Sequence, residues 1–288
     1  MLGFGLGLRT QHYSHVLESR PKIDWFEVIS ENFMIPGGRP LRILNEIRKD
    51  YPVVLHGVSL SLGTPDPLNQ DYLKNLKSLI DKIQPPWFSD HLCWTSLGGH
   101  YSHDLLPLPY NDEALKRVIS NIDKVQDFMG RQMLVENVSS YVTYKSSEMT
   151  EWEFLSEVVS KTGCKLLLDV NNIYVSSRNH GFNPVDFLNG IQVGAVGQMH
   201  LAGHTDNGDH LIDTHDHAVC DPVWGLYKQA CRRFGAVATM IERDANIPEF
   251  SEIQAEMVKA KSLQEKILSE AYPSQRSSKN ILEESSIH

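Results

Sequence analysis

The 288-residue sequence lacks three features that would assign it to a common class of protein. It has no run of about 18 apolar residues, and its start has neither the basic segment nor the long apolar stretch of a signal peptide. Its four cysteines show no Cys-x-x-Cys spacing, unlike those of a disulfide-rich secreted domain or a zinc ribbon. We therefore expect a cytoplasmic protein that does not span a membrane.

Positive charge is also scarce in this chain. Its 27 Lys and Arg residues against 36 Asp and Glu residues give a formal net charge of -9. Binding to nucleic acid depends on clustered Lys and Arg side chains, so the composition predicts that nucleic acid is not a partner. The hydrophobic share of 41% and the charged share of 22% are typical of a globular protein with a sizeable core.

Short apolar segments rich in strand-forming residues recur along the chain, and each is followed by polar or turn residues. They cover residues 3–9, 25–30, 53–59, 87–94, 133–138, 165–172, 196–203 and 238–244. Amphipathic segments of helical period alternate with them, at residues 11–19, 38–50, 69–83, 111–129, 150–161, 184–191, 221–234 and 248–268. Gly130 is a stop signal for one of these helices, and Thr150 with Glu153 has the spacing of a capping box at the start of the next.

This alternation predicts an α/β fold, a (β/α)8 TIM barrel, in residues 1–270. A doubly wound parallel sheet is the alternative, but it gives no reason for polar residues at the end of almost every strand. The last residues, 271–288, are rich in Ser and aperiodic, and we expect them to form a disordered tail.

In a TIM barrel the functional site lies at the carboxyl ends of the strands. Imidazole, carboxylate and amide side chains occur at six successive predicted strand ends or in the loops that follow them. They are His56, His91, Glu136, Asp169, Asn172, His200, Asp213, His215 and Glu242. Four carboxylates aimed at one barrel mouth would repel one another unless cations lay between them. This set, without Cys, suits iron, zinc, manganese or cobalt, and nine ligands are too many for one ion. The sequence therefore predicts a site for two or three metal ions.

The segment 199–218 contains five of the chain's 13 histidines and four aspartates. We expect His200 to end a strand, and Asp213 and His215 to return from the next loop as a ligand pair, because residues two apart point the same way in an extended segment. His204 is a candidate proton donor or a support for the metal ligands. We expect His210 and His217 to be solvated.

Further polar residues lie beside the predicted ligands. They fall into two groups, those that would orient metal-bound imidazoles and those that would contact the substrate. The first group comprises Ser59, Asp90 and Asn137, and the second comprises Glu27, Glu31, Asn32 and Arg243. Ordinary loop hydrogen bonding is the alternative for each of them.

Several phrases of the sequence resemble one bacterial family of multinuclear non-heme iron-dependent oxidative enzymes, whose members include the iron oxidase of methanobactin biosynthesis. The phrases include "FEVISENFM", "LHGVSLSLG", "SDHLCW", "VENVSSYV" and "LLLDVNNIYVSSRNHG". The order of the nine ligands also resembles that of endonuclease IV and the wider xylose-isomerase-like barrels, although endonuclease IV has a histidine where this chain has Asn172. The family resemblance implies two or three irons, O2 as oxidant, and a cysteine of a ribosomally made precursor peptide as substrate. It also implies a separately encoded partner protein that delivers the peptide.

Three other functions remain open from the sequence. A zinc-dependent phosphodiesterase like endonuclease IV would use most of the same ligands, but it would need a basic groove that the composition does not favour. A sugar isomerase or epimerase would use the same barrel with fewer metals. A metal-storing binding protein would not need open coordination positions.

Overall fold

The computed structural model describes residues 2–271, and the predicted tail after residue 271 lies outside the described residues. Within them, eight parallel strands close into a barrel in the order β1-β12-β9-β8-β7-β4-β3-β2. These strands are β1 Phe4–Gly7, β2 Trp25–Ile29, β3 Val53–Gly57, β4 Phe88–His91, β7 Leu134–Glu136, β8 Lys165–Asp169, β9 Val196–Leu201 and β12 Ala238–Ile241. The predicted (β/α)8 barrel is confirmed, and the doubly wound sheet is excluded.

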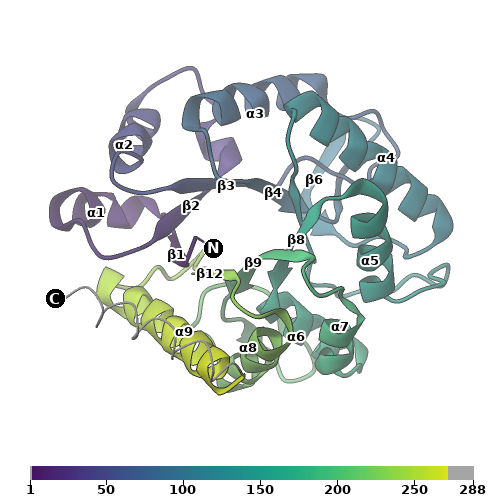
Figure 1. Ribbon diagram of the computed structural model, residues 1–288. Helices are drawn as coiled ribbons and strands as arrows, with labels where there is room; N and C mark the ends of the chain where they lie inside the picture. The colour runs from purple at the N-terminus through teal and green to yellow at the C-terminus, as the bar shows by residue number, and fades with distance from the viewer. Residues whose placement is uncertain (1, 272–288) are drawn as a thin grey trace, which may run out of the picture.

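Helices surround this barrel (Figure 1). They are α1 Tyr13–Ser19, α2 Arg39–Ile47, α3 Gln70–Ile83, α4 Asp112–Met129, α5 Glu151–Thr162, α6 Val170–His180, α7 Pro184–Gly190, α8 Asp221–Phe234 and α9 Phe250–Ala271. Short 3-10 helices η1 Thr10–His12 and η2 Ser30–Phe33 follow β1 and β2. None of the described helices is long and apolar enough to cross a membrane.

Local signals explain where two of these helices begin and end. The Asn111 side chain accepts a hydrogen bond from Ala114 N at the start of α4, and Gly130 ends that helix in the left-handed conformation. Thr150 and Glu153 form the predicted capping box at the start of α5. The helix α5 follows β7, and β7 ends at Glu136. The first turn of α5 therefore lies at the same end of the barrel as Glu136.

Three parts of the structure were not predicted. The predicted strand segment 165–172 was expected to turn between Asp169 and Asn172. The strand stops at Asp169, whose side chain caps the unpredicted helix α6 by accepting from Asn172 N. Most residues of α6 are themselves buried, polar ones included. The sequence therefore shows no amphipathic period that would identify this helix. An antiparallel hairpin of β5 Trp94–Leu97 and β6 His100–Leu106 lies between β4 and α4, and a second small sheet pairs β10 Thr205–Asp206 with β11 Leu211–Ile212.

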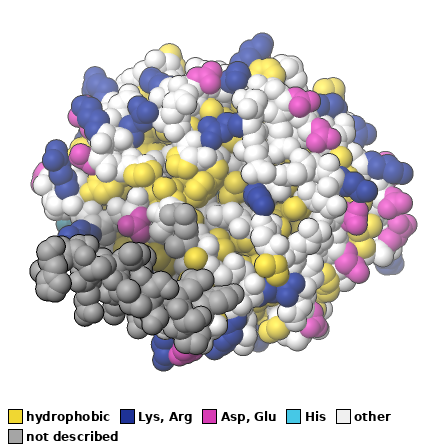
Figure 2. Space-filling model, in the orientation of Figure 1, with side chains coloured by type: hydrophobic (Ala, Val, Ile, Leu, Met, Phe, Trp, Pro, Cys, Tyr) yellow, Lys and Arg dark blue, Asp and Glu magenta, His cyan; other side chains and the backbone are white. Residues whose placement is uncertain are grey.

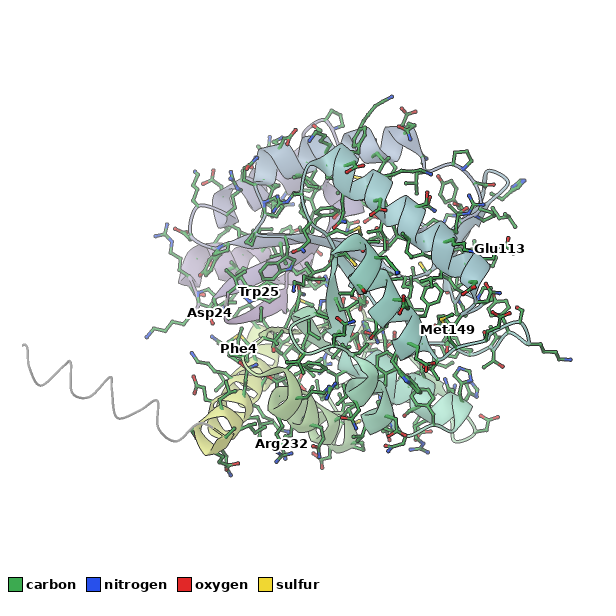
Figure 3. All side chains as sticks on the ribbon, turned by 45° about the vertical axis from the view of Figure 1, so that its right-hand side comes forward. Phe4, Asp24, Trp25, Glu113, Met149 and Arg232 are labelled. Carbon is green, nitrogen blue, oxygen red and sulfur yellow. The ribbon has the colours of Figure 1, made fainter. Side chains whose placement is uncertain are left out.

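The apolar core lies mostly between the strands and the helices, and a smaller cluster lies where the barrel strands begin. Trp25 in that cluster meets Trp87 edge to face at 5.8 Å between ring centroids. In Figure 3, Phe4 and Trp25 lie close together with Asp24, whose carboxylate accepts from Phe4 N at 2.8 Å. On the face seen in Figure 2, hydrophobic side chains gather across the middle and charged side chains lie mostly toward the rim. The polar candidates for function lie at the opposite ends of the strands from Trp25.

Candidate metal centre

The register of the barrel brings the predicted ligands together. His91 at the end of β4 pairs with Glu136 at the end of β7, and Asp169 at the end of β8 pairs with His200 in β9. All four side chains are buried, and their exposed fractions are 8% or less. A buried row of acids and imidazoles on neighbouring strands results.

The first cluster consists of His56, His91 and Glu136. The Oε2 atom of Glu136 lies 3.1 Å from His56 Nε2 and 3.3 Å from His91 Nε2. These spacings match the edge between two ligands of one ion, roughly 3.0–3.4 Å for metal–ligand bonds of about 2.1 Å. His91 Nδ1 lies 3.0 Å from the Gly57 carbonyl oxygen and donates to it, so Nε2 is the ring nitrogen that faces the carboxylate.

The second cluster continues from the other oxygen of Glu136. His200 Nδ1 lies 3.5 Å from Glu136 Oε1, 3.9 Å from Asp169 Oδ2 and 3.1 Å from Glu242 Oε2. Its other ring nitrogen, Nε2, lies 3.0 Å from Glu27 Oε1 at the end of β2. Glu136 therefore faces both clusters, one with each oxygen.

The third cluster brings His215 to Asp169 and Glu242, with ligand atoms within 4.8 Å of one another. His215 Nε2 is 2.6 Å from Asp213 Oδ1, so the Asp-x-His pair does return to the site as predicted. Asn172 donates from Nδ2 to the Asn137 carbonyl oxygen at 3.1 Å, and its Oδ1 atom is buried without a hydrogen-bond partner. The amide oxygen thus remains free to bind a cation.

Unpartnered buried atoms test whether these residues fit metal ions. Each cluster contains at least one such atom. Those among the described residues include Glu136 Oε2, Asp169 Oδ2, Asn172 Oδ1, His200 Nδ1 and His215 Nε2. Some of these five atoms lie close to an acid or imidazole atom of the same cluster, but none makes a hydrogen bond of normal geometry. Leaving buried polar atoms without hydrogen bonds is costly, and these five belong to side chains of the types that bind divalent transition metals. The clusters could therefore bind metal ions.

The pKa values reflect the same crowding of charges. Burial raises the pKa of Glu136 to about 7, against the lowering effect of His200, and burial with the neighbouring Glu136 raises the pKa of Asp169 well above its usual range. Burial alone would lower the pKa of His200, but Glu27 and Glu242 together with Glu136 outweigh it and raise it.

Polar neighbours hold the candidate ligands from behind. Asp90 accepts hydrogen bonds from His91 N at 2.8 Å and from Leu60 N at 3.2 Å, which ties the loop after β3 to the end of β4. Asn137 Nδ2 donates to the Asp169 carbonyl oxygen, and Asn137 Oδ1 accepts from Asp169 N at 2.9 Å. Both residues act on the backbone at the strand ends rather than on an imidazole ring.

The remaining candidates lie at different distances from the clusters. Glu31 Oε1 accepts from Val58 N at 2.9 Å, so this side chain supports the loop after β3. Asn32 is exposed and Ser59 is half-buried. The Arg243 side chain is buried against α9, where it donates to Glu256 Oε2 at 2.5 Å, and so points away from the clusters.

His204 is connected to the third cluster through Asn171. His204 Nδ1 donates to Asn171 Oδ1 at 2.7 Å, and Asn171 Nδ2 donates to Asp213 Oδ1 at 2.7 Å. The His204 ring is half-buried, and burial lowers its pKa. His210 and His217, by contrast, are exposed as expected.

Sequence reasoning missed Arg9, which lies two residues after β1. Its guanidinium contacts Asp244, lies 3.5 Å from Glu242 Oε1, and donates from Nε to the Arg243 carbonyl oxygen. Asp244 Oδ2 in turn lies 3.1 Å from His215 Nδ1. Applying the strand-end rule to the first strand as well would have identified Arg9. Tyr72, whose hydroxyl donates to Glu31 Oε1 at 2.7 Å, had no such signal because it lies within α3.

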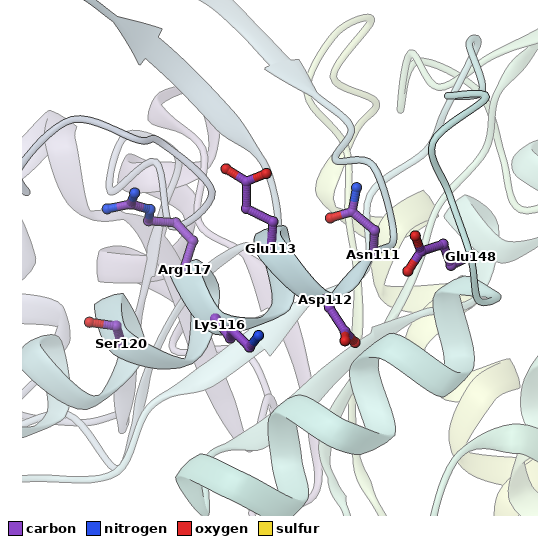
Figure 4. Close-up of a pocket in the computed structure, with 7 residues that line it drawn as sticks. All are labelled: Asn111, Asp112, Glu113, Lys116, Arg117, Ser120 and Glu148. Atoms are coloured by element: carbon purple, nitrogen blue, oxygen red, sulfur yellow. The ribbon is translucent and has the colours of Figure 1, made fainter.

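A large cavity among the described residues does not coincide with the metal clusters. It has a volume of about 560 Å³ and lies at the start of α4, and its lining includes Asp112, Lys116 and Glu148 (Figure 4). Its residues carry both charge signs and include none of the nine predicted ligands. We therefore assign the chemistry to the buried clusters rather than to this cavity.

Solved structures share the closed barrel of eight parallel strands that carries these clusters. Endonuclease IV from Thermus thermophilus superposes with a TM-score of 0.59 at 15% identity and covers 92% of this chain and 99% of that one. D-psicose 3-epimerase from Clostridium cellulolyticum superposes with a TM-score of 0.58 at 10% identity, with the same coverage. At these identities the likeness shows the fold alone.

The chain belongs to the RiPP precursor modification enzyme family MbnB/TglH/ChrH, which it matches over residues 3–265. RiPPs are ribosomally made, post-translationally modified peptides, and the match confirms the resemblance carried by the sequence phrases. A UPF0276 protein of Anaeromyxobacter sp. (strain Fw109-5) is 54% identical over 260 residues, covering 90% of this chain and 92% of that protein. A UPF0276 protein of Vibrio parahaemolyticus is 44% identical over 263 residues, covering 90% and 91%. These relatives' names state no activity.

Proposed function

We propose that this protein is a multinuclear iron-dependent enzyme that uses O2 to modify a cysteine of a ribosomally made precursor peptide. Its membership of a family of RiPP precursor modification enzymes supports a peptide substrate. The observation that carries the metal assignment is the continuous row of three clusters, in which Glu136 and Asp169 are each shared by two groups of candidate ligands. A carboxylate shared by two groups of ligands lets a protein bind two ions a short distance apart.

The proposed ligands are the nine predicted residues. His56, His91 and Glu136 would hold one ion, and Glu136 and Asp169 with His200 the next. His215 with Asp169 and Glu242 would hold the third, with Asp213 and Asn172 beside them. Imidazole and carboxylate donors without thiolate suit iron, and zinc or manganese can occupy such a set during purification.

Bound iron would supply the redox chemistry with O2 and an acceptor for the substrate sulfur. The chain supplies the charge balance, because four ligand carboxylates offset only four of the six positive charges of three divalent ions. The remaining charge favours an anionic group such as a thiolate. Because no cysteine of the chain lies among the candidate ligands, the sulfur position is left to the substrate.

Residues behind the clusters would fix the ligand atoms. Glu27 faces Nε2 of His200, which leaves Nδ1 directed at Glu136 and Glu242. Asp244 does the same for Nδ1 of His215, which leaves Nε2 directed at Asp213. Such contacts set the tautomer and orientation of a metal-bound imidazole.

The experiment uses a cysteine-containing peptide encoded beside the gene, together with any small protein encoded there as the delivery partner. Iron-loaded enzyme, peptide and O2 should consume O2 and change the peptide mass, and the peptide with Ser in place of that Cys should remain unmodified. Zinc-loaded enzyme is the matched control and should be inactive. Turnover with zinc, or without O2, would contradict the proposal and favour a hydrolase or isomerase of the same barrel.

A further inference from the structure

A second cavity lies on the barrel end that carries the metal clusters. It has a volume of about 280 Å³ and lies between the segment after β6, the loop after β7 and the end of α6. We call it the Glu151 pocket, and we define it by Tyr110, Tyr144, Met149, Glu151, Trp152 and Phe182. In Figure 3, Met149 of this pocket lies on the right, away from Phe4 and Trp25 on the left.

Aromatic and apolar side chains form most of its wall. Trp152 meets Phe182 at 5.6 Å between ring centroids, and the four aromatic rings of the pocket are all half-buried rather than sealed in the core. The volume is near the lower end of small-ligand pockets, which span about 300–1,000 Å³. The pocket therefore suits a group of side-chain size.

One acid lies inside this apolar wall. Glu151 is 8% exposed, and its Oε1 atom is buried without a hydrogen-bond partner. No Lys or Arg is among the described lining residues, and no ion pair joins Glu151 to another described residue. The other titratable side chains of the lining are Tyr110, Tyr144 and His180. The Tyr110 hydroxyl lies within hydrogen-bonding reach of the Glu151 carboxyl, and His180 Nε2 is engaged with Ser140 Oγ at 2.7 Å.

A buried carboxyl surrounded by aromatic faces is complementary to a cation with an apolar stem. The carboxylate supplies a charged acceptor, and the faces of Trp and Tyr rings attract a cation that lies over them. Arginine and lysine side chains have this form, a hydrocarbon stem with a cationic end. Burial raises the pKa of Glu151 to about 8, in keeping with a carboxyl that lacks its counter-ion.

We propose that the Glu151 pocket binds an arginine or lysine side chain of the peptide substrate, an inference whose peptide part rests on the proposed function. The pocket and the metal clusters share the loop after β7, in which Ser140 of the pocket wall lies four positions after Glu136. Four residues span at most about 14 Å. A cation held in the pocket would therefore fix the peptide a few residues from the cysteine at the metals.

The test measures binding of two probe peptides to the full chain at pH 8.5. One is acetyl-Gly-Arg-Gly-amide, and the other replaces Arg with the neutral isostere citrulline. Wild type should bind the arginyl peptide about tenfold more tightly, as expected for a charged hydrogen bond. Glu151→Gln should lose this preference, whereas Glu157→Gln, on the exposed side of the same helix, should keep it. Phe182→Leu is a second variant that leaves the carboxyl in place, and it should weaken the binding of both peptides.

Several results would overturn the proposal. Equal affinity for the two peptides, no binding of either, or a preference that survives in Glu151→Gln would each contradict it. Binding of n-butylguanidinium but not of the arginyl peptide would assign the pocket to a free cation instead of the substrate. Binding should be the same with and without metal, so a protein that fails the iron assay but still prefers the arginyl peptide would contradict only the proposed function.

Discussion

Replacing Glu136 by Gln separates the charge of this residue from its role in metal binding. In the metal-free protein, burial raises its pKa from 4.5 to about 7. A carboxyl whose pKa is raised on folding favours the folded state less and less as pH rises from the unfolded value through the folded one. The shift corresponds to about 3 kcal/mol of lost unfolding free energy at pH 8 and to about 1 kcal/mol at pH 5.

Glu136→Gln removes this penalty because the amide never ionises. Without metal, we therefore expect the variant to have the higher unfolding free energy. Its advantage over wild type should grow by about 2 kcal/mol from pH 5 to pH 8. With metal, the order should reverse, because an ion present at 1,000 times its Kd stabilises wild type by about 4 kcal/mol. Urea unfolding with chelator, and again with iron, measures both quantities.

The exposed Glu157→Gln is the matched control and should follow wild type at both pH values. A gap between Glu136→Gln and wild type that does not widen with pH would refute the reasoning. It would mean that the Glu136 carboxylate is already compensated in the metal-free protein. A variant that retains the full stabilisation by metal would refute the assignment of Glu136 as a shared ligand.

Substitutions at three further residues test the clusters and their surroundings. Glu27→Gln removes the anionic acceptor beside His200 Nε2 and should weaken metal binding by about 10–100-fold, measured by competition with a chelator; unchanged affinity would argue against that support. Arg9→Ala removes the guanidinium that pairs with Asp244 and Glu242, so it should lower the metal content, and Arg9→Lys should restore part of it. Equal metal content in wild type and both variants would mean that Arg9 serves the fold alone. Asn172→His exchanges a neutral amide ligand for imidazole and should raise occupancy of the third site; elemental analysis that finds no increase would show that Asn172 is not a ligand.

The sequence predicts the barrel well because the physical signal is repeated. Each barrel strand is largely buried and reads as a short apolar run, and helices such as α4 and α5 carry their own caps. The helix α6 was missed because seven of its 11 residues are buried, polar ones such as Asn171 and Ser176 among them, so apolar and polar residues do not alternate with a helical period. The β5–β6 hairpin was missed because β6 is largely exposed and lacks an apolar pattern.

The ends of the strands also predict most residues of the candidate site. The rule brings His91 next to Glu136 and Asp169 next to His200, and the register of the barrel agrees. It does not predict which nitrogen of His200 faces the cluster, because that depends on Glu27 across the barrel. Nor does it predict Tyr72, whose contact with Glu31 depends on how α3 packs on η2.

The central claim is that the three clusters hold several coupled iron ions. The most direct test is to purify the protein without oxygen, count iron, zinc and manganese by elemental analysis, and record Mössbauer and EPR spectra of the same sample. The account predicts two or three irons per chain and a mixed-valence signal from coupled ions after partial oxidation. A colourless protein that contains only zinc, or a single isolated iron, would contradict it.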